Sequence, residues 1–452
     1  MAEIMARNRR TRNPSSIAAS YCAVYWLLLG QAFLFIFWPT DAEAQYLAVP
    51  PPSLPSEVRN LVVLPSLAVS EEYNDNVYLT RYNKLDDYIT SATPAFTLDY
   101  KSAFWNWHLD AAYIYRYYAK GTRKEDNTYT VNLSNHTTLI ENFFFLDVLD
   151  TYSRVSLDET RDYTLESPFV NQTDENIFTV NPYFVFRSES RFTPILGYKY
   201  VNTWYKEHNV VSYVGQPVST VDNIGYAEMM TDLSSTVTFT IGVRYTQDVN
   251  DVNSYNRTDV YAGPKYTYAQ SSYAFCLIGE SFLDFQLETS TTKHMIWDAG
   301  INHKYSTVTV AYEMKSDYVP DPVKILRRED FYTVTVSKTT PRTSYIVLAG
   351  LYEWRNAASN HLENSSYLLN GFLKHALSQT QTIELSESIE RLEDDLADTV
   401  ISLWHSDIKF IQRTLADLIL TLEYNYTNSY SHDSYTDNYV NNRFIVGLSK
   451  KF

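Results

Sequence analysis

The chain contains very little cysteine. Of its 452 residues only Cys22 and Cys276 are cysteines, and Cys22 lies in an N-terminal segment that we expect to be removed. Export routes that oxidise thiols favour proteins with paired cysteines or almost none. With only Cys276 remaining, a disulfide within the mature chain and a cysteine-based metal site are excluded.

Long hydrophobic runs are missing after residue 45, although the chain has 39 Tyr, 22 Phe and 8 Trp. A membrane-spanning helix needs about 20 consecutive apolar residues, and the mature chain has no such run. The mean hydropathy of the whole 452-residue chain is only −0.30. Abundant aromatic residues with low mean hydropathy are typical of strands that alternate apolar and polar side chains.

Positive charge is also scarce. The chain has 37 Lys and Arg against 53 Asp and Glu, which gives a net charge of −16. No basic stripe is present, so nucleic acid is not expected as a partner.

Enzyme motifs are absent as well. The sequence has no G-x-S-x-G, no H-E-x-x-H and no glycine-rich phosphate loop. We therefore predict no enzymatic activity, no cofactor and no metal site. The alternative is a barrel enzyme whose catalytic Ser, His and Asp residues come from adjacent strands. Such residues are distant in sequence, so they form no short motif.

The N-terminus has the three parts of a secretory signal peptide. Four arginines precede an apolar run at 21–38, and Ala42-Glu43-Ala44 resembles a cleavage site before Gln45. Residues 1–44 are therefore predicted to be a cleaved signal peptide. A retained anchor is the alternative, because the apolar run is long enough to span a bilayer. Residues 45–60 follow as a Pro-rich periplasmic lead-in.

From residue 61 onward, apolar and polar residues alternate with the period of two that is typical of a β-strand. In the segment 104–117, Trp105, Trp107 and Leu109 share one face, and His108 and Asp110 share the other. Aromatic residues gather towards both ends of this segment. This distribution is typical of a strand whose apolar face meets lipid between two interfacial belts.

The connections between strands alternate between tight and long. Ile140–Asn142 and Gln270–Ser271 are tight, whereas Asn74–Asp87 and Ser316–Arg328 are long and polar. Short periplasmic turns and longer outer loops are the rule for outer-membrane barrels. We predict an all-β, transmembrane antiparallel up-and-down β-barrel of about 20 strands (range 16–20) over residues 61–452, in the bacterial outer membrane, where it contacts lipid and lipopolysaccharide. A β-sandwich is the alternative.

The last strand runs to the terminus. Phe444, Val446, Leu448 and Phe452 fall on one face, and polar residues such as Arg443 fall on the other. Soluble chains usually end in frayed polar residues. A closed barrel instead pairs its last strand with its first, so this segment is predicted to close the barrel.

Charged residues at positions predicted to face the lumen include both signs. A charged pore lining would tune which solutes pass, whereas paired charges that only keep a watery lumen soluble and rigid are the alternative. The candidates are His108, Asp110, Arg116, Arg154, Arg187, Lys199, Arg244, Lys265, Glu280, Asp284, Asp298 and Lys304.

Two loop segments carry clustered oxygen-bearing side chains. Glu71, Tyr73, Asp75 and Asn76 lie in a stretch that fits an Asn/Asp turn, and a Ca²⁺ site is the alternative. The segment Tyr426–Tyr439 alternates Tyr with short polar residues, which suits sugar stacking but equally suits a plain solvated loop.

The stretch LPSLAVSEEYNDNVYLT (Leu64–Thr80), with Glu71, Tyr73, Asp75 and Asn76 at its centre, together with the ending VGLSKKF (Val446–Phe452), resembles a family of outer-membrane β-barrel porins. Members of that family are often encoded near exopolysaccharide and surface-sorting loci. The resemblance implies that the C-terminal residues Phe444, Val446, Leu448 and Phe452 are read by the barrel-insertion machinery, although Lys450 departs from the usual apolar residue.

The functional prediction is an outer-membrane porin-like barrel that passes hydrophilic solutes or exported polysaccharide through a charged lumen. The alternative is a non-transporting surface barrel whose acidic, Tyr-rich loops bind a ligand or scaffold envelope components. The oligomeric state is left open by the sequence.

Overall fold

The computed structural model describes residues 61–124, 126–157, 172–186, 191–206, 216–287, 291–321, 323, 325–395, 398–414, 417–431 and 438–452. The predicted signal peptide and Pro-rich lead-in lie outside these residues, as does Arg187. Within them, no helix is both long and apolar enough to cross a membrane.

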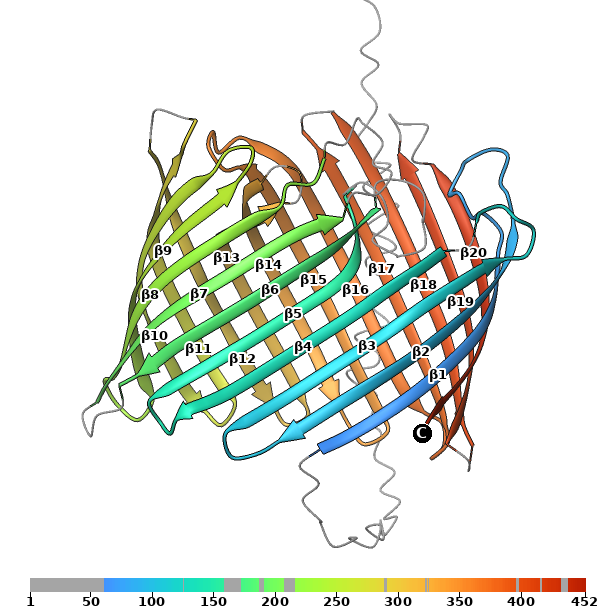
Figure 1. Cartoon of the computed structure of the whole chain (residues 1–452), viewed down its shortest axis with the longest axis horizontal. Coiled ribbons are helices and arrows are strands. Elements are labelled where there is room, and N and C mark those ends of the chain that lie inside the picture. The colour runs from blue at the N-terminus through green and yellow to red at the C-terminus, as the bar shows by residue number, and fades with distance from the viewer. Residues whose placement is uncertain are drawn as a thin grey trace, which may run out of the picture. The chain divides into compact units, whose positions relative to one another are not determined.

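Twenty antiparallel strands form one sheet in which each strand pairs with its neighbours in sequence, and β1 pairs with β20 from Ser66–Lys451 to Asn74–Arg443. This pairing closes the barrel (Figure 1). The predicted fold class and the even strand count are confirmed. The strands are β1 (Leu61–Asn74), β2 (Asp87–Lys101), β3 (Trp105–Tyr118), β4 (Asp126–Ile140), β5 (Phe144–Ser156), β6 (Gln172–Val185), β7 (Phe192–Lys206), β8 (Thr220–Asp232), β9 (Val237–Asn250), β10 (Tyr255–Ala269), β11 (Ser272–Phe285), β12 (Thr292–Tyr305), β13 (Val308–Asp321), β14 (Ile325–Thr339), β15 (Thr343–Asn356), β16 (Leu362–Ala376), β17 (Gln381–Asp394), β18 (Thr399–Arg413), β19 (Leu418–Ser431) and β20 (Tyr439–Lys451).

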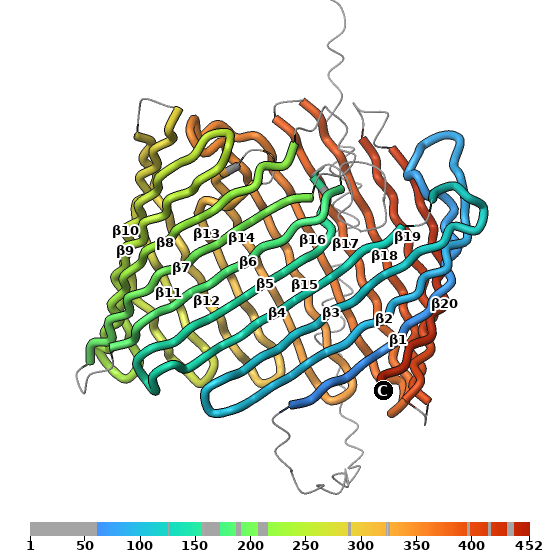
Figure 2. The backbone as a smooth tube through the Cα atoms, in the orientation of Figure 1, coloured from blue at the N-terminus to red at the C-terminus, as the bar shows by residue number. Residues whose placement is uncertain are grey.

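Figure 2 shows the strands tilted across the wall, with hairpin turns at both rims. We call the rim that holds Leu61 and Phe452 the turn end, and the opposite rim the loop end. Four turn-end hairpins repeat one hydrogen bond, in which a Ser or Thr oxygen accepts from the backbone N–H three residues later. These bonds run from Trp105 to Ser102 (3.0 Å), Val237 to Ser234 (3.1 Å), Thr343 to Thr340 (3.0 Å) and Gln381 to Ser378 (3.1 Å).

Glycine is rare at the tight turns. Asn142 and Ser271 instead adopt the positive φ values (60° and 64°) that hairpin turns require. Asn and, less readily, Ser tolerate this conformation, so the hairpins form without the glycines that the chain lacks.

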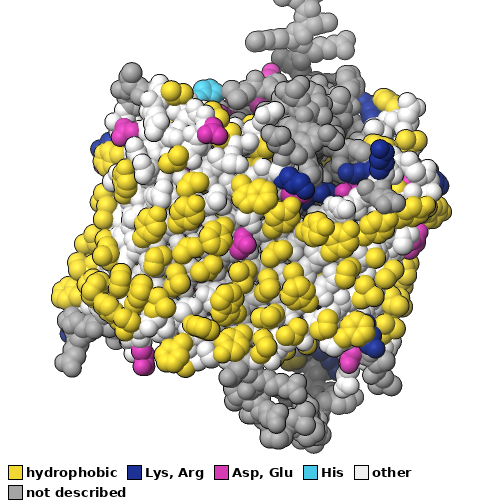
Figure 3. Space-filling model, in the orientation of Figure 1, with side chains coloured by type: hydrophobic (Ala, Val, Ile, Leu, Met, Phe, Trp, Pro, Cys, Tyr) yellow, Lys and Arg dark blue, Asp and Glu magenta, His cyan; other side chains and the backbone are white. Residues whose placement is uncertain are grey.

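The two faces of the wall differ in polarity. The face that carries Phe444, Val446 and Leu448, here called outward, exposes large apolar side chains, and these three are 53%, 51% and 45% exposed. Figure 3 shows apolar side chains covering the visible outer surface, with Lys and Arg gathered near its upper rim. Among the described residues, buried polar or charged residues outnumber buried hydrophobic ones. The polarity is therefore reversed relative to a soluble protein.

Near the loop end, outward-facing tyrosines bond to asparagines on the neighbouring strand. The three hydroxyl groups donate to an asparagine Oδ1 atom at 2.6 to 3.0 Å. An aromatic ring whose hydroxyl group meets a polar partner suits a boundary between apolar and aqueous surroundings. The pairs are Tyr198–Asn223, Tyr245–Asn256 and Tyr424–Asn442.

The loop motif of the sequence lies at the closing seam between β1 and β20. Asp75 Oδ2 accepts from Asn442 Nδ2 at 2.6 Å, and Asn76, which is fully buried, donates through Nδ2 to Val440 O at 3.0 Å. Glu71 and Tyr73 face outward beside β2, where Thr90 donates to Glu71 at 2.7 Å. The motif therefore fastens the two ends of the barrel together.

A buried ion pair strengthens the same seam on the inward face. Arg443 donates through Nε and Nη2 to the two carboxylate oxygens of Glu72, at 2.7 and 2.8 Å. Bidentate pairs of this kind are among the strongest polar contacts in proteins.

Candidate functional site in the barrel lumen

The register of the strands decides which of the predicted lumen residues face inward. The inward set is His108, Asp110, Arg116, Lys199, Arg244, Lys265, Asp298 and Lys304. Arg187 lies outside the described residues. Whether the inward residues line a conducting path stays a prediction.

Two candidates, Glu280 and Asp284, lie on the other face. Glu280 pairs with Val260, which is 47% exposed on the outward face, and Glu280 bonds to Lys293 Nζ at 2.9 Å. Asp284 pairs with Asn256 on that face. Arg154 has the parity of the outward Tyr152, but it lies beyond the last residue of β5 that pairs with β4, and its guanidinium bonds to Asp126, which is opposite the inward Arg116, and to Asp174. For Glu280 and Asp284 the expected place in the lumen is wrong, because the register puts both carboxylates on the outward face of β11.

Towards the turn end, several lumen charges are paired with one another. The ring nitrogens of His108 lie 2.9 Å from Asp99 Oδ1 and 2.7 Å from Asp110 Oδ2, an arrangement that uses both N–H groups of a protonated imidazole. His136 Nδ1 lies 2.6 Å from Asp147 Oδ1. These contacts line a cavity of about 490 Å³ towards the turn end. The lumen wall there is charged but locally neutralised.

At the loop end, a denser charge network joins strands that are not neighbours. Arg257 on β10 donates through Nε to Asp259 Oδ1 at 2.7 Å and through Nη2 to Asp317 on β13. Arg244 on β9 reaches the same two carboxylates, Asp259 at 2.7 Å and Asp317 at 3.5 Å. Asp259 is fully buried and Arg257 is 6% exposed.

This network requires the tip of the β13–β14 hairpin to turn into the lumen. Adjacent strands lie about 4.8 Å apart, so positions three strands apart along the wall are separated by about 14 Å. Arg257 Nη1 nevertheless lies 3.4 Å from Tyr318 O. Residues beyond Ser316 on β13 have no partner on β12, so the tip has separated from the wall at that point.

Apolar packing confirms the direction of the turn. Tyr318 has the parity of Tyr312, which faces outward and is 41% exposed. Tyr318 is nevertheless buried, in one cluster with the inward residues Tyr255 and Leu283 and with Leu326 of β14. The outward face of the hairpin tip thus packs against the inner face of β10 and β11. The predicted long loop Ser316–Arg328 is wrong: both strands continue through it, with only 322–324 between them.

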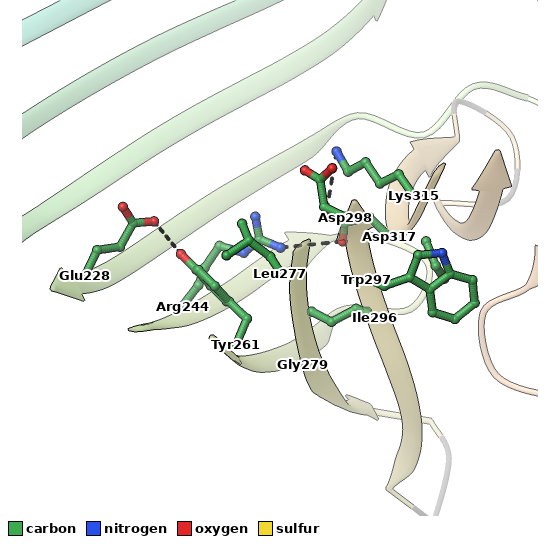
Figure 4. Close-up of a pocket in the computed structure, with 11 residues that line it drawn as sticks. Glu228, Arg244, Tyr261, Leu277, Gly279, Ile296, Trp297, Asp298, Lys315 and Asp317 are labelled. Carbon is green, nitrogen blue, oxygen red and sulfur yellow. Dashed lines mark hydrogen bonds and ion pairs between the residues drawn. The ribbon is translucent and has the colours of Figure 1, made fainter. Parts of the chain in front are cut away.

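A cavity of about 210 Å³ lies where β13 leaves the wall (Figure 4). Tyr261 donates its hydroxyl hydrogen to Glu228 on one side, and Arg244 contacts Asp317 on the other. Asp298 Oδ1 is buried here without a hydrogen-bond partner in the described part of the chain. The cavity therefore offers a hydroxyl-rich ligand both hydrogen-bond acceptors and an aromatic ring.

An acidic pair sits above the outward tyrosine belt, at the loop end. Asp222 and Asp248 are directly opposite in β8 and β9, and both are buried. Burial and the neighbouring Asp222 carboxylate raise the pKa of Asp248 to about 7.

Arg257, Asp259 and Asp317 are not among the residues that the sequence predicts to line the lumen. On β10, Arg257 and Asp259 share the parity of Lys265, which is predicted to face the lumen. The alternation of this strand could therefore have identified both residues as inward-facing. For Asp317 no signal existed, because its role depends on how the hairpin tip bends.

These features define the class of protein as a large, closed, antiparallel β-barrel with a polar lumen and an apolar outer surface. No protein-family model matches the sequence, and no curated protein matches it in sequence. The resemblance to porins of exopolysaccharide loci therefore stays a prediction.

Solved structures of similar architecture include three outer-membrane or iron-transport proteins. The FrpB iron transporter from Neisseria meningitidis matches with a TM-score of 0.47 and 7% identity over 86% of this chain and 81% of that chain. The ferric enterobactin receptor PfeA from Pseudomonas aeruginosa gives 0.47 and 9% over 86% and 80%. The alcaligin outer membrane receptor FauA from Bordetella pertussis gives 0.39 and 8% over 86% and 76%. At these identities and TM-scores, the matches do not bear on what this chain transports or binds.

Proposed function

We propose that this chain is an outer-membrane β-barrel that passes hydrophilic solutes or exported polysaccharide through its charged lumen. The observation that carries the proposal is the closed 20-stranded wall with apolar residues outward and polar residues inward. Only closed barrels and helices satisfy every backbone hydrogen bond in lipid. Barrels of 16–18 strands already leave an aqueous channel, so a wall of this size encloses water.

The apolar outer surface supports an outer-membrane location. Exposed side chains such as Leu67, Val69 and Ile278 would be a solubility liability in water but are suited to lipid. The proposal assigns no catalysis, cofactor or resident metal to the chain. No group of three or more His, Cys, Asp or Glu side chains in its described part is arranged to hold a metal ion.

Single-channel recording from the refolded protein in planar lipid bilayers tests the pore. We expect stable conducting steps of nanosiemens order. Loss of the compact, fast-migrating band on heating in detergent gels would establish beforehand that the protein tested is a folded barrel. A folded barrel that stays electrically silent would refute the proposed pore.

The second candidate is a non-transporting surface barrel that binds a ligand. It is favoured by one observation, the inward-turned β13–β14 tip, which packs into the mouth through Tyr318 and Leu326. A silent barrel that opens after removal of this tip would favour this second function.

A further inference from the structure

Aromatic side chains on the lumen wall lie flat against it instead of projecting into the water. Tyr226 faces inward on β8, directly opposite Gly197 of β7. A Cβ atom at Gly197 would lie 2.2 Å from Cζ of Tyr226. The distal half of the ring therefore covers the backbone of the neighbouring strand. One ring face rests on the wall, and the other faces the lumen.

The same arrangement recurs two strands further on. Tyr261 of β10 lies opposite Gly242 of β9, where a Cβ atom would be 2.4 Å from Cζ of Tyr261. Both rings are held in place through their hydroxyl groups, since Tyr226 donates to Asn181 Oδ1 at 3.0 Å and Tyr261 donates to Glu228. The rings are thus fixed in orientation before any ligand arrives.

Two further rings extend this surface towards the turn end. Tyr183 of β6 is opposite Gly197 on its other side. Its ring stacks with that of Phe145 on β5 at a centroid distance of 5.3 Å. We call Phe145, Tyr183, Tyr226 and Tyr261 the aromatic track. All four are partly exposed.

The track climbs through the lumen. Phe145 is the second residue of β5 and lies next to the turn end, whereas Tyr261 is near the middle of β10 and lines the cavity of Figure 4. From β5 to β10 the track crosses five strand spacings of about 4.8 Å, so it extends over roughly 24 Å. A surface of this length suits a chain-like ligand better than a single small molecule.

The groups beside the track decide the chemistry of that ligand. Asn181, Glu228 and Asp147 flank the rings, and each side chain has a second polar atom besides the one that bonds to Tyr226, Tyr261 or His136, so a purely apolar ligand would cost the hydration of those atoms. Arg244, the cation beside Tyr261, is already bonded to Asp259 and Asp317. Lys315, the other cation that lines this cavity, lies 3.9 Å from Asp317. Among the described residues, a polyanion would therefore meet carboxylates at that end of the track, and both cations there already contact Asp317.

We propose that the aromatic track is a binding surface for a linear, uncharged glycan chain, whose C–H faces stack on the rings and whose hydroxyl groups bond to the flanking Asn181 and Glu228. A sugar ring presents both kinds of surface at once, with apolar faces and hydroxyl edges. The inference deepens the proposed function and rests on it in one respect, that the lumen admits the chain.

Neutral linear glucan hexasaccharide and dextran sulfate serve as the two probes. Binding is measured by calorimetry on the full barrel in detergent micelles, and block of the ion current is measured in bilayers. We expect the hexasaccharide to bind the native protein, and the Tyr226→Ala/Tyr261→Ala variant to bind it at least about tenfold more weakly, because two of the stacking rings are lost.

Matched variants separate stacking from a loss of structure. Tyr226→Phe should keep most of the affinity because its ring remains, whereas Gly197→Ala should weaken binding by pushing that ring off the wall. Tyr245→Ala removes a tyrosine from the outward face and should change nothing. Heat-modifiable gel migration establishes that each variant is folded.

The outcomes distinguish the two proposals. A silent barrel that binds the hexasaccharide through Tyr226 and Tyr261 refutes the pore but keeps the track. A conducting barrel whose double variant binds within twofold of the native protein overturns the track and keeps the pore. Preference for dextran sulfate over the neutral hexasaccharide also overturns the track as proposed.

Discussion

Neutralising one carboxylate should loosen the inward-turned hairpin tip. Asp317 holds the tip through Arg257 and Arg244, which belong to β10 and β9 on the wall. Asp317→Asn removes the negative charge but keeps one oxygen that can accept a hydrogen bond. The tip, residues 318–326, has hydrogen-bonded strand partners only within its own hairpin, so it can open without disturbing the rest of the wall.

The size of the effect follows from the burial of Arg257. Removing one partner of a buried ion pair costs about 3–5 kcal/mol. Arg257 retains Asp259 at 2.7 Å, and the asparagine oxygen remains, so we expect a smaller loss of about 2 kcal/mol. The apolar contacts of Tyr318 and Leu326 stay intact and keep the tip mostly closed. A loss of this size corresponds to about 30-fold more frequent opening.

Hydrogen–deuterium exchange followed by mass spectrometry measures this opening directly. In Asp317→Asn, amides in peptides covering 318–328 should exchange about 30-fold faster than in the native barrel, given the 2 kcal/mol loss. Peptides from β9 should be unchanged. Glu313→Gln is the matched control, because it removes an inward carboxylate from the same strand without touching Arg257. Equal exchange in Asp317→Asn and in native protein would refute the account of how the tip is held.

Three shorter predictions concern the seam, the acidic pair and the C-terminus. Glu72→Gln should lower the temperature at which the folded gel band disappears, because it breaks the buried pair at the seam at a cost of about 3 kcal/mol, whereas Glu71→Gln on the outward face should have little effect. The pKa of Asp248 is raised above its unfolded value, so the folded state retains a proton that the unfolded state loses, and stability falls as pH rises from about 4 to about 7. Asp248→Asn should therefore stabilise the barrel at pH 8, by up to about 4 kcal/mol in denaturant titrations, and not at pH 3; equal effects at both pH values would contradict this reasoning. Phe452→Ser should reduce the amount of barrel recovered from the outer membrane of expressing cells, and Lys451→Ser should not, if the terminal aromatic residue is read during insertion.

The alternation of strands could be predicted because a barrel wall has two different surroundings. Each side chain on a strand meets either lipid or water, and the period of two is therefore present in the sequence itself. The last strand illustrates this, since Phe444, Val446 and Leu448 are on the outward face as predicted. Hairpin ends such as Asn74 and Asp87 were also placed correctly, because turn residues there interrupt the pattern.

The face that a charged residue occupies was harder to predict. The alternation predicted that Glu280 faces the lumen, yet it lies outward with Lys293 as its partner. An ion pair between side chains on two neighbouring strands gives both charged groups a partner on the outward face. The sequence pattern of a single strand does not reveal such a pair. The prediction for the hairpin tip was wrong for a different reason. Both faces of the tip contact protein or water at the loop end of the lumen, and neither faces lipid. The residues from Ser316 to Arg328 therefore lack the alternation of the wall and resemble a loop in sequence.

Glycine, which the chain uses sparingly, marks the lumen surface more specifically than charge does. Gly197 and Gly242 are inward positions where a β-branched or aromatic residue would suit a strand better. Each instead lies beneath a tyrosine ring from the next strand, and a Cβ atom would displace that ring. Because strands do not need glycine, its presence opposite Tyr226 and Tyr261 is explained by the space that a ring lying flat on the wall requires. A lumen that needed only paired charges to stay soluble would gain nothing from this arrangement, whereas one that guides a chain of sugar rings would.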